Sequence, residues 1–194
     1  VVKVPTMLHR FSTRLAQVEL GLAGFFALLV TVLIIYNVIT RAMDNSQFWV
    51  DEAAIFAMIW MLFLGTSVLL KQRKAVAVTA LVDVFPRRWR RIVGVFVDLS
   101  VLLFGVLLLV FCWKWYAPLD MIQAGFDKDA FSAETFNFMY QEKAVTLPMY
   151  KFWAWLIVPY FALSLCFHTL VNLINDPRGH YTVSYTHLTL PTKR

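Results

Sequence analysis

Charged residues are scarce in this sequence. Of its 194 residues, 15% are charged and 60% are hydrophobic, whereas a soluble domain carries roughly 25% charged and about 45–50% apolar residues. A soluble core of this size would not bury so many apolar side chains, so the composition excludes a soluble enzyme and a disordered chain. The net charge of +6 does not predict a nucleic-acid partner, because basic residues in so hydrophobic a chain typically face anionic lipid.

Cysteine, glycine and proline are also few, at two, seven and seven residues. The low glycine and proline contents exclude fibrous and low-complexity classes. Cys112 and Cys166 both lie in apolar runs, which is typical of small hydrophobic side chains rather than of a metal knuckle or a disulfide framework. The sequence has no phosphate-binding glycine loop, zinc-ligand spacing or nucleophile elbow. We therefore expect no enzymatic activity, no cofactor and no metal.

Four apolar segments are long enough to cross ~30 Å of hydrocarbon, which takes about 20 helical residues. Helices are required because lipid leaves an unpaired backbone unsatisfied. The predicted fold is an all-α membrane protein, with a membrane domain over residues 17–174 between a cytoplasmic segment 1–16 and a tail 175–194 that we expect to be disordered or partly non-native. The first span is too long for a signal peptide and is interpreted as uncleaved. The predicted spans are residues 17–40, 49–70, 92–116 and 152–174.

The basic residues predict the orientation of the spans. Thirteen Lys and Arg residues lie in segments 1–16, 71–91 and 175–194, against at most five on the opposite side. Cytoplasmic loops carry the excess of Lys and Arg. We therefore expect both termini and the linker 71–91 to face the cytoplasm.

The linker carries its own apolar pattern. Val78, Val82, Phe85 and Trp89 follow one another at spacings of four, three and four, which places them on one stripe of a helix. A helix with such a stripe, basic residues and an interfacial Trp lies in the membrane plane. We expect this in-plane helix on the cytoplasmic side, broken or kinked at Pro86; an ordinary basic loop is the alternative.

The longest connection, residues 117–149, joins spans three and four. It carries five acidic and two lysine residues, with aromatic residues interleaved among them. Loops longer than about 15 residues without secondary structure are uncommon. We expect short helices here, lying against the outer surface.

Ionisable residues inside the spans are costly and are the first candidates for function. Asp98 and His168 lie at similar predicted depth and are in a position to pair, either as part of a proton path or, as we favour, as a structural hydrogen bond. Glu19 lies at the predicted start of span one, where its side chain would reach the interface. We expect the hydroxyls of Ser67 and Ser164 to bond to the preceding helical turn.

One segment resembles a known family. Residues 49–65 are similar to the second span of the small membrane subunit of TRAP (tripartite ATP-independent periplasmic) transporters, in which an aromatic residue and a Glu precede a Trp and a Gly. The basic residues around 71–74 and 84–88 and the start of span four at 147–159 are also similar, so the resemblance covers about residues 15–175. The loop 117–147 is longer than is typical of the family. The matching residues of span two are Trp49, Glu52, Trp60 and Gly65.

The resemblance implies a function without catalysis. Such a subunit lies in the bacterial inner membrane beside a large transport subunit that binds substrate and sodium. A periplasmic binding protein delivers the substrate, usually an organic acid, and the small subunit acts as a scaffold that helps it dock. A stand-alone four-span membrane enzyme or redox carrier, and a small four-helix exporter, are the alternatives.

Span two is the predicted contact with the large subunit. Its aromatic residues form a broad face that would pack against this partner, although lipid is the alternative occupant. Of the two carboxylates Asp51 and Glu52, we expect one to cap the helix and Glu52 to reach a basic group across the interface. The predicted interface set is Trp49, Glu52, Phe56, Trp60, Phe63, Leu64 and Gly65.

Overall fold

The computed structural model describes residues 7–73 and 86–175 of the chain. Four helical segments are long and apolar enough to cross a membrane, judged by length and composition. The prediction of an all-α membrane protein with four spans is therefore confirmed. The helices are α1 (Met7–Ala42), α2 (Phe48–Lys71), α4 (Arg87–Tyr116), α5 (Pro118–Gln123), α6 (Lys128–Thr135), α7 (Lys151–Trp155) and α8 (Ile157–Asn175).

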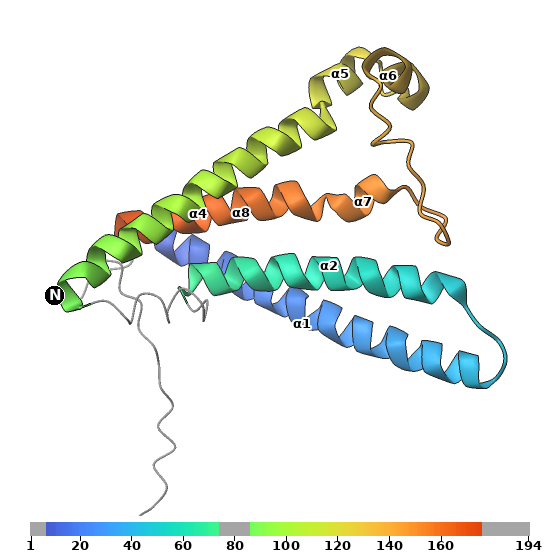
Figure 1. Cartoon of the computed structure of the whole chain (residues 1–194), viewed down its shortest axis with the longest axis horizontal. Helices are drawn as coiled ribbons and strands as arrows, with labels where there is room; N and C mark the ends of the chain where they lie inside the picture. The colour runs from blue at the N-terminus through green and yellow to red at the C-terminus, as the bar shows by residue number, and fades with distance from the viewer. Residues whose placement is uncertain (1–6, 74–85, 176–194) are drawn as a thin grey trace, which may run out of the picture.

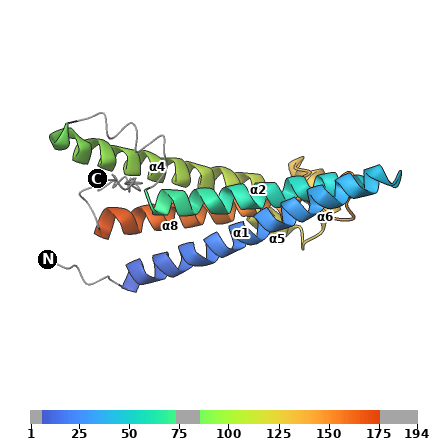
Figure 2. The ribbon, with the colours of Figure 1, turned by 90° about the horizontal axis from the view of Figure 1, so that it is seen from below.

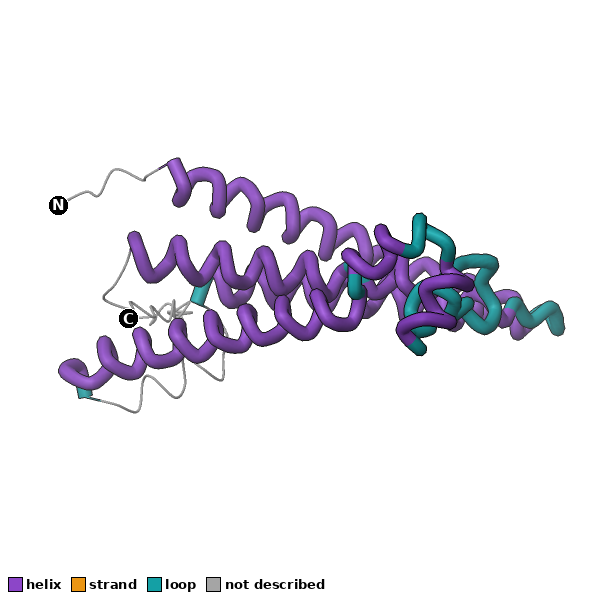
Figure 3. The backbone as a smooth tube through the Cα atoms, turned by 90° about the horizontal axis from the view of Figure 1, so that it is seen from above, coloured by secondary structure: helices purple, strands orange, loops and turns teal. Residues whose placement is uncertain are grey.

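The four spans form an elongated bundle in which α8 is the central helix (Figure 1). Helices α1 and α2 make an antiparallel hairpin, and α8 contacts α1, α2 and α4. Seen from below, the start of α1 and the end of α8 lie at the same end of the bundle as the end of α2 and the start of α4 (Figure 2). The short helices α5 and α6 lie at the opposite end, among the loops of the outer connection (Figure 3).

Three of the predicted spans differ from the helices by more than one residue. Helix α4 begins at Arg87 rather than at residue 92. Helix α1 begins at Met7 rather than at residue 17, because the basic residues of the extra turns end the apolar run without ending the helix. Span four is interrupted: α7 ends at Trp155 and α8 begins at Ile157. Pro159 explains this break, because it has no N–H to donate to the carbonyl four residues earlier.

The core lies where α1, α2 and α8 meet. Ala23, Leu64 and Ile157 are its buried members, and Phe26 and Trp60 pack against them. Around this core, long apolar side chains of α1, α2 and α4 are exposed. Such a surface is what a membrane protein presents to lipid or to a partner helix.

Helix α4 packs closely against α8 at Gly105. A Cβ at this position would lie 2.7 Å from the Cys166 Sγ, so a larger residue here would require the Cys166 side chain to move. Glycine therefore fits the close packing of α4 against side chains of α8. The two cysteines themselves are buried and unpaired, as the sequence indicated.

The connection between spans three and four contains the short helices α5 and α6. The prediction of short helices in this segment is confirmed, and their place against the outer surface stays a prediction. The prediction of an in-plane helix concerns Val78, Val82 and Phe85, which lie outside the described residues. Trp89 is exposed in the first turn of α4. The tail beyond residue 175 also lies outside the described part, and the orientation stays a prediction.

Candidate functional site

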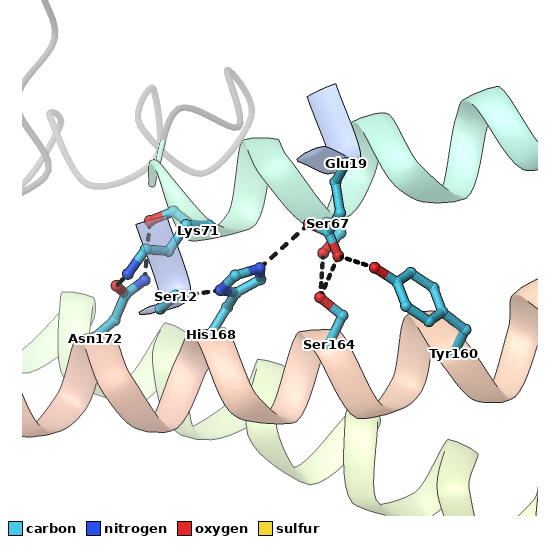
Figure 4. Close-up of polar contacts among 8 residues, drawn as sticks. All are labelled: Ser12, Glu19, Ser67, Lys71, Tyr160, Ser164, His168 and Asn172. Atoms are coloured by element: carbon cyan, nitrogen blue, oxygen red, sulfur yellow. Dashed lines mark hydrogen bonds and ion pairs between the residues drawn. The ribbon is translucent and has the colours of Figure 1, made fainter. Parts of the chain in front are cut away.

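A group of polar side chains is buried between three of the four spans. Each of α1, α2 and α8 contributes to it, and Figure 4 shows the side chains pointing toward one another. We call this group the buried polar cluster. Its buried members are Ser12, Glu19, Ser67, Ser164 and His168, and the hydroxyl of Tyr160, a residue that is 37% exposed, reaches it from the edge.

Glu19 is the centre of the cluster and has no solvent-exposed surface. Its Oε1 accepts hydrogen bonds from Tyr160 Oη at 3.0 Å and Ser164 Oγ at 2.5 Å, and its Oε2 lies 3.2 Å from His168 Nε2. The Ser67 hydroxyl lies 3.0 Å from the Ser164 hydroxyl and ties α2 to the same group. Converging donors of this kind stabilise the ionised carboxylate, which only accepts hydrogen bonds.

His168 bridges the carboxylate to the start of α1. It is 1% exposed, its Nε2 faces Glu19 and its Nδ1 lies 2.7 Å from Ser12 Oγ. A proton on Nε2 therefore lies between the ring and the carboxylate, and Nδ1 either accepts from the Ser12 hydroxyl or donates to it. Both nitrogens of this buried ring are satisfied without water.

The predicted pair of Asp98 and His168 is not what the structure shows. Asp98 Oδ2 accepts from the Arg73 guanidinium at 2.5 Å, and both side chains are 8% exposed. Two residues at the same depth contact each other only if their helices turn those side chains toward each other. His168 instead faces α1. The prediction that Glu19 reaches the interface is also wrong, because α1 begins twelve residues before it.

Two further expectations failed at the hydroxyl residues. Ser67 and Ser164 bond to each other between helices rather than to their own preceding turns. Thr66, one position from Ser67, does donate to the Leu62 carbonyl of its own turn at 2.8 Å. The difference follows from the direction of each side chain, toward α8 for Ser67 and away from it for Thr66.

A signal for the cluster was present in the sequence of α8. Tyr160, Ser164, His168 and Asn172 follow one another at intervals of four, which places them on one helical stripe. The last of them exchanges hydrogen bonds of 3.1 Å with Lys71, one with the ammonium and one with the carbonyl. The stripe thus faces α1 and α2 along its whole length.

Glu52 is held by the segment that precedes α7. Its carboxylate accepts from the backbone N–H groups of Val145, Thr146 and Leu147 at 2.9, 2.7 and 3.1 Å, and from the Thr146 hydroxyl at 2.7 Å. From the sequence, we expected Glu52 to pair with a basic group of another subunit. In the structure, all the hydrogen-bond donors to this carboxylate come from the same chain. Glu52 thereby anchors the loop before α7 to α2.

Asp51 has a different role from the expected helix cap. The cap residue of α2 is Gln47, and no side chain accepts from the first turn. Asp51 Oδ2 accepts from Arg41 at 2.7 Å, and Oδ1 accepts from the Asn37 amide. This carboxylate therefore closes the α1–α2 hairpin, and both members of the ion pair are about half exposed.

Most of the predicted interface on span two packs inside the chain. Leu64 is 1% exposed, the Trp60 Nε1 donates to the Ala154 carbonyl at 2.9 Å, and the Phe63 ring lies 5.0 Å from that of Phe161. Apolar periodicity marks a buried face but does not say which chain covers it. Here α1 and α8 cover it.

The remaining members of the predicted set lie toward the surface. Phe56 is half-buried beside an apolar pocket between α1, α2 and the start of span four. Trp49 is 39% exposed next to Tyr36, and nothing packs within 4 Å of a Cβ placed on Gly65. A separate stripe of α2 is exposed, consisting of Phe48, Ile55, Met58, Leu62 and Leu69.

Comparison with known proteins identifies the family of this chain. The sequence model of the tripartite ATP-independent periplasmic transporters, DctQ component, matches residues 30–179. A C4-dicarboxylate TRAP transporter small permease protein DctQ from Vibrio cholerae serotype O1 is 29% identical over 114 residues. The match covers 58% of this chain and 49% of that protein, so the chain spans about half the length of the curated relative it matches. No solved structure matches.

Proposed function

The chain belongs to the DctQ family of tripartite ATP-independent periplasmic transporters, and we propose that it scaffolds a large transport subunit and helps a periplasmic binding protein to dock. A member of this family is a transporter component of the bacterial inner membrane and not an enzyme. Membership of this family argues against both alternatives, which were a stand-alone enzyme or redox carrier and a small four-helix exporter.

The buried polar cluster is the observation that carries the proposal. Three spans are joined by hydrogen bonds around one carboxylate, inside a region where lipid offers no replacement partner. Sliding one helix past another would leave Glu19 uncompensated. This arrangement suits a stationary support rather than a moving transport element.

The ionisable side chains of the described residues give no sign of an ion-binding site. Within residues 7–73 and 86–175, no group of His, Cys, Asp and Glu residues could hold a metal ion. The buried carboxylate is occupied by the chain's own donors. We infer that substrate and coupling ion bind to the partner subunit. By extension from the relative's name, the transported compound is an organic acid such as a C4-dicarboxylate.

The surface for the large subunit is the exposed stripe of α2. Ile55, Met58 and Leu62 are 51%, 47% and 60% exposed on one side of this helix. Their side chains recur at spacings of three and four, as those of a helix–helix seam do. In a membrane such helices associate through close packing rather than through hydrophobic burial alone.

Reconstitution with the partner tests the proposal. The chain is co-expressed with the large transport subunit of the same system, and the complex is purified through a tag on either chain. We expect a stable complex, and ion-coupled uptake of an organic acid into vesicles only when both subunits and the binding protein are present. Full uptake by the large subunit without this chain would contradict the scaffold role.

A further inference from the structure

An apolar pocket lies at the outer ends of spans three and four. It has a volume of about 650 Å³, within the range of small-molecule sites, and it is formed by the α4–α5 junction, the loop after α5 and the start of α7. Its walls are almost entirely hydrophobic. They include Met121, Ile122, Phe126, Tyr140, Phe152 and Trp153.

A second, polar pocket of about 520 Å³ adjoins it. The two share Phe126, Lys128 and Tyr150 as lining residues. The Lys128 Nζ lies 3.7 Å from the centre of the Tyr150 ring, and the Lys143 Nζ lies 5.8 Å from the same ring. The combined cavity therefore has one apolar end and one polar end, which two ammonium groups and the carboxylates of Asp127 and Asp129 line.

These two ammonium groups have no carboxylate partner within the described residues. Lys151, by contrast, binds Glu142 at 2.6 Å. The two acidic residues of the polar pocket are hydrogen-bonded to neighbours in it and form no ion pair with Lys128 or Lys143: Asp127 accepts from the Asp129 backbone N–H at 2.9 Å, and Asp129 accepts from the Gln141 amide at 2.6 Å. The lysines hence remain available to an external anion.

The position of the cavity selects the kind of ligand. It lies where span three ends and span four begins, in the part of a membrane protein that contacts lipid headgroups. Aromatic rings gather here, as in an interfacial belt: Trp115 contacts Tyr116 and Trp155, and Tyr140 contacts Phe152. A ligand from this layer has an acyl chain and a polar headgroup.

We propose that this cavity binds one phospholipid with an anionic headgroup. Its phosphate lies between Lys128 and Lys143, and the upper part of one acyl chain fills the apolar pocket beside Ile122 and Phe126. A free phosphate would leave the apolar part empty. A zwitterionic lipid also carries a phosphate, but its own cationic group offsets that charge, so the two lysines would hold it less tightly than an anionic lipid. The inference rests on the membrane location of the chain and not on the transporter that it serves.

Native mass spectrometry of the full chain in detergent tests the proposal. The probes are phosphatidylglycerol and phosphatidylcholine with the same acyl chains. We expect at least tenfold tighter binding of phosphatidylglycerol, and a loss of this preference in the Lys128→Gln/Lys143→Gln double variant. Lys114→Gln is the matched control, because this exposed lysine lies at the same end of the bundle and lines neither pocket.

A second variant tests the apolar pocket, and its control distinguishes loss of lipid binding from misfolding of the chain. Ile122→Trp should weaken binding of both lipids, whereas Leu28→Trp, on the exposed surface of α1, should weaken neither. Equal affinity for both lipids in the wild type, or an unchanged preference in the double lysine variant, would overturn the proposal. So would loss of the bound lipid when the large subunit is added, since the partner would then be the occupant.

Discussion

Glu19 and His168 lie 149 residues apart in the sequence and contact each other in the middle of the bundle, with Oε2 3.2 Å from Nε2. The contact joins α1, which begins the described chain, to α8, which ends it. Neither side chain has more than 1% of its surface exposed. Because the pair is buried with all its hydrogen-bonding groups engaged, it fixes the rotation of both helices about their axes.

The first prediction concerns this pair. His168→Phe removes the donor and leaves a buried carboxylate, which costs about 3–5 kcal/mol of stability when the charge stays unpaired. Glu19→Gln in the same background should restore part of that loss, since the amide carries no charge. Thermal unfolding of the purified variants in detergent measures both changes. Glu19→Gln alone completes the cycle, and a loss in the double variant equal to the sum of the two single losses would show that the residues are not coupled.

A single hydroxyl of the cluster should matter much less. Interhelical hydrogen bonds in membrane proteins contribute about 0.6 kcal/mol on average and at most about 1.7. Ser164→Ala should fall in this range and toward its upper end, because Ser164 bonds to both Glu19 and Ser67. Ser100→Ala is the control, since Ser100 donates only to the Phe96 carbonyl of its own helix. A smaller loss for Ser164→Ala than for the control would contradict the role of the cluster.

These contacts show where prediction from sequence ends. The four spans were predictable because hydropathy is a local property of about 20 consecutive residues. The family was predictable from the residues around Glu52 and Trp60. The cluster was not, because Glu19 and His168 come together only once α1 and α8 have packed. A stripe of polar residues at intervals of four on α8 indicated a polar face but not its partner.

The predicted interface on span two illustrates the same principle. A large aromatic side chain such as Trp60 is apolar whether its own bundle or another subunit covers it. The sequence therefore identified a buried face of α2 but gave no information on the covering chain. Glu52 is a similar case, since a carboxylate that needs donors finds them equally well in a partner's side chains or in three backbone N–H groups of its own loop.

The third prediction concerns Gly105, where α4 approaches α8. Alanine gains about 1 kcal/mol over glycine in a helix, but a Cβ here would lie 2.7 Å from the Cys166 Sγ, and overpacking costs about 1–3 kcal/mol. Gly105→Ala should therefore be neutral to destabilising, and Cys166→Ala in the same chain should reverse the loss. Gly65→Ala, where nothing lies within 4 Å, should be stabilising. Unfolding temperatures compare the three, and stabilisation by Gly105→Ala alone would refute the close packing.

The fourth prediction concerns the hydrogen bonds of Glu52. In Glu52→Gln the side chain accepts through one oxygen only, so the backbone N–H groups of residues 145–147 should exchange with solvent faster. Asp51→Asn, one residue away, should leave their exchange unchanged, because Asp51 bonds to Arg41 and Asn37 instead. Hydrogen–deuterium exchange followed by mass spectrometry measures this segment. Equal exchange in the two variants would show that Glu52 does not hold the loop.

The last prediction separates the inner face of α2 from its outer face. Trp60→Ala removes a ring packed against Phe26 and the hydrogen bond to the Ala154 carbonyl, and large-to-small changes of this kind cost about 3–5 kcal/mol in a core. It should lower the unfolding temperature of the isolated chain. Leu62→Ala lies on the exposed stripe and should leave that temperature unchanged.

With the large subunit present, the order of the two variants should reverse. Leu62→Ala should lower the yield of the complex relative to the yield of the chain, because it removes a contact that only the partner makes. Trp60→Ala should lower both yields together, because the chain itself is less stable. Co-purification through a tag on the large subunit, with each yield divided by the amount of folded chain, distinguishes the two effects. If the normalised yield falls for Trp60→Ala and not for Leu62→Ala, the aromatic face of span two is the contact after all.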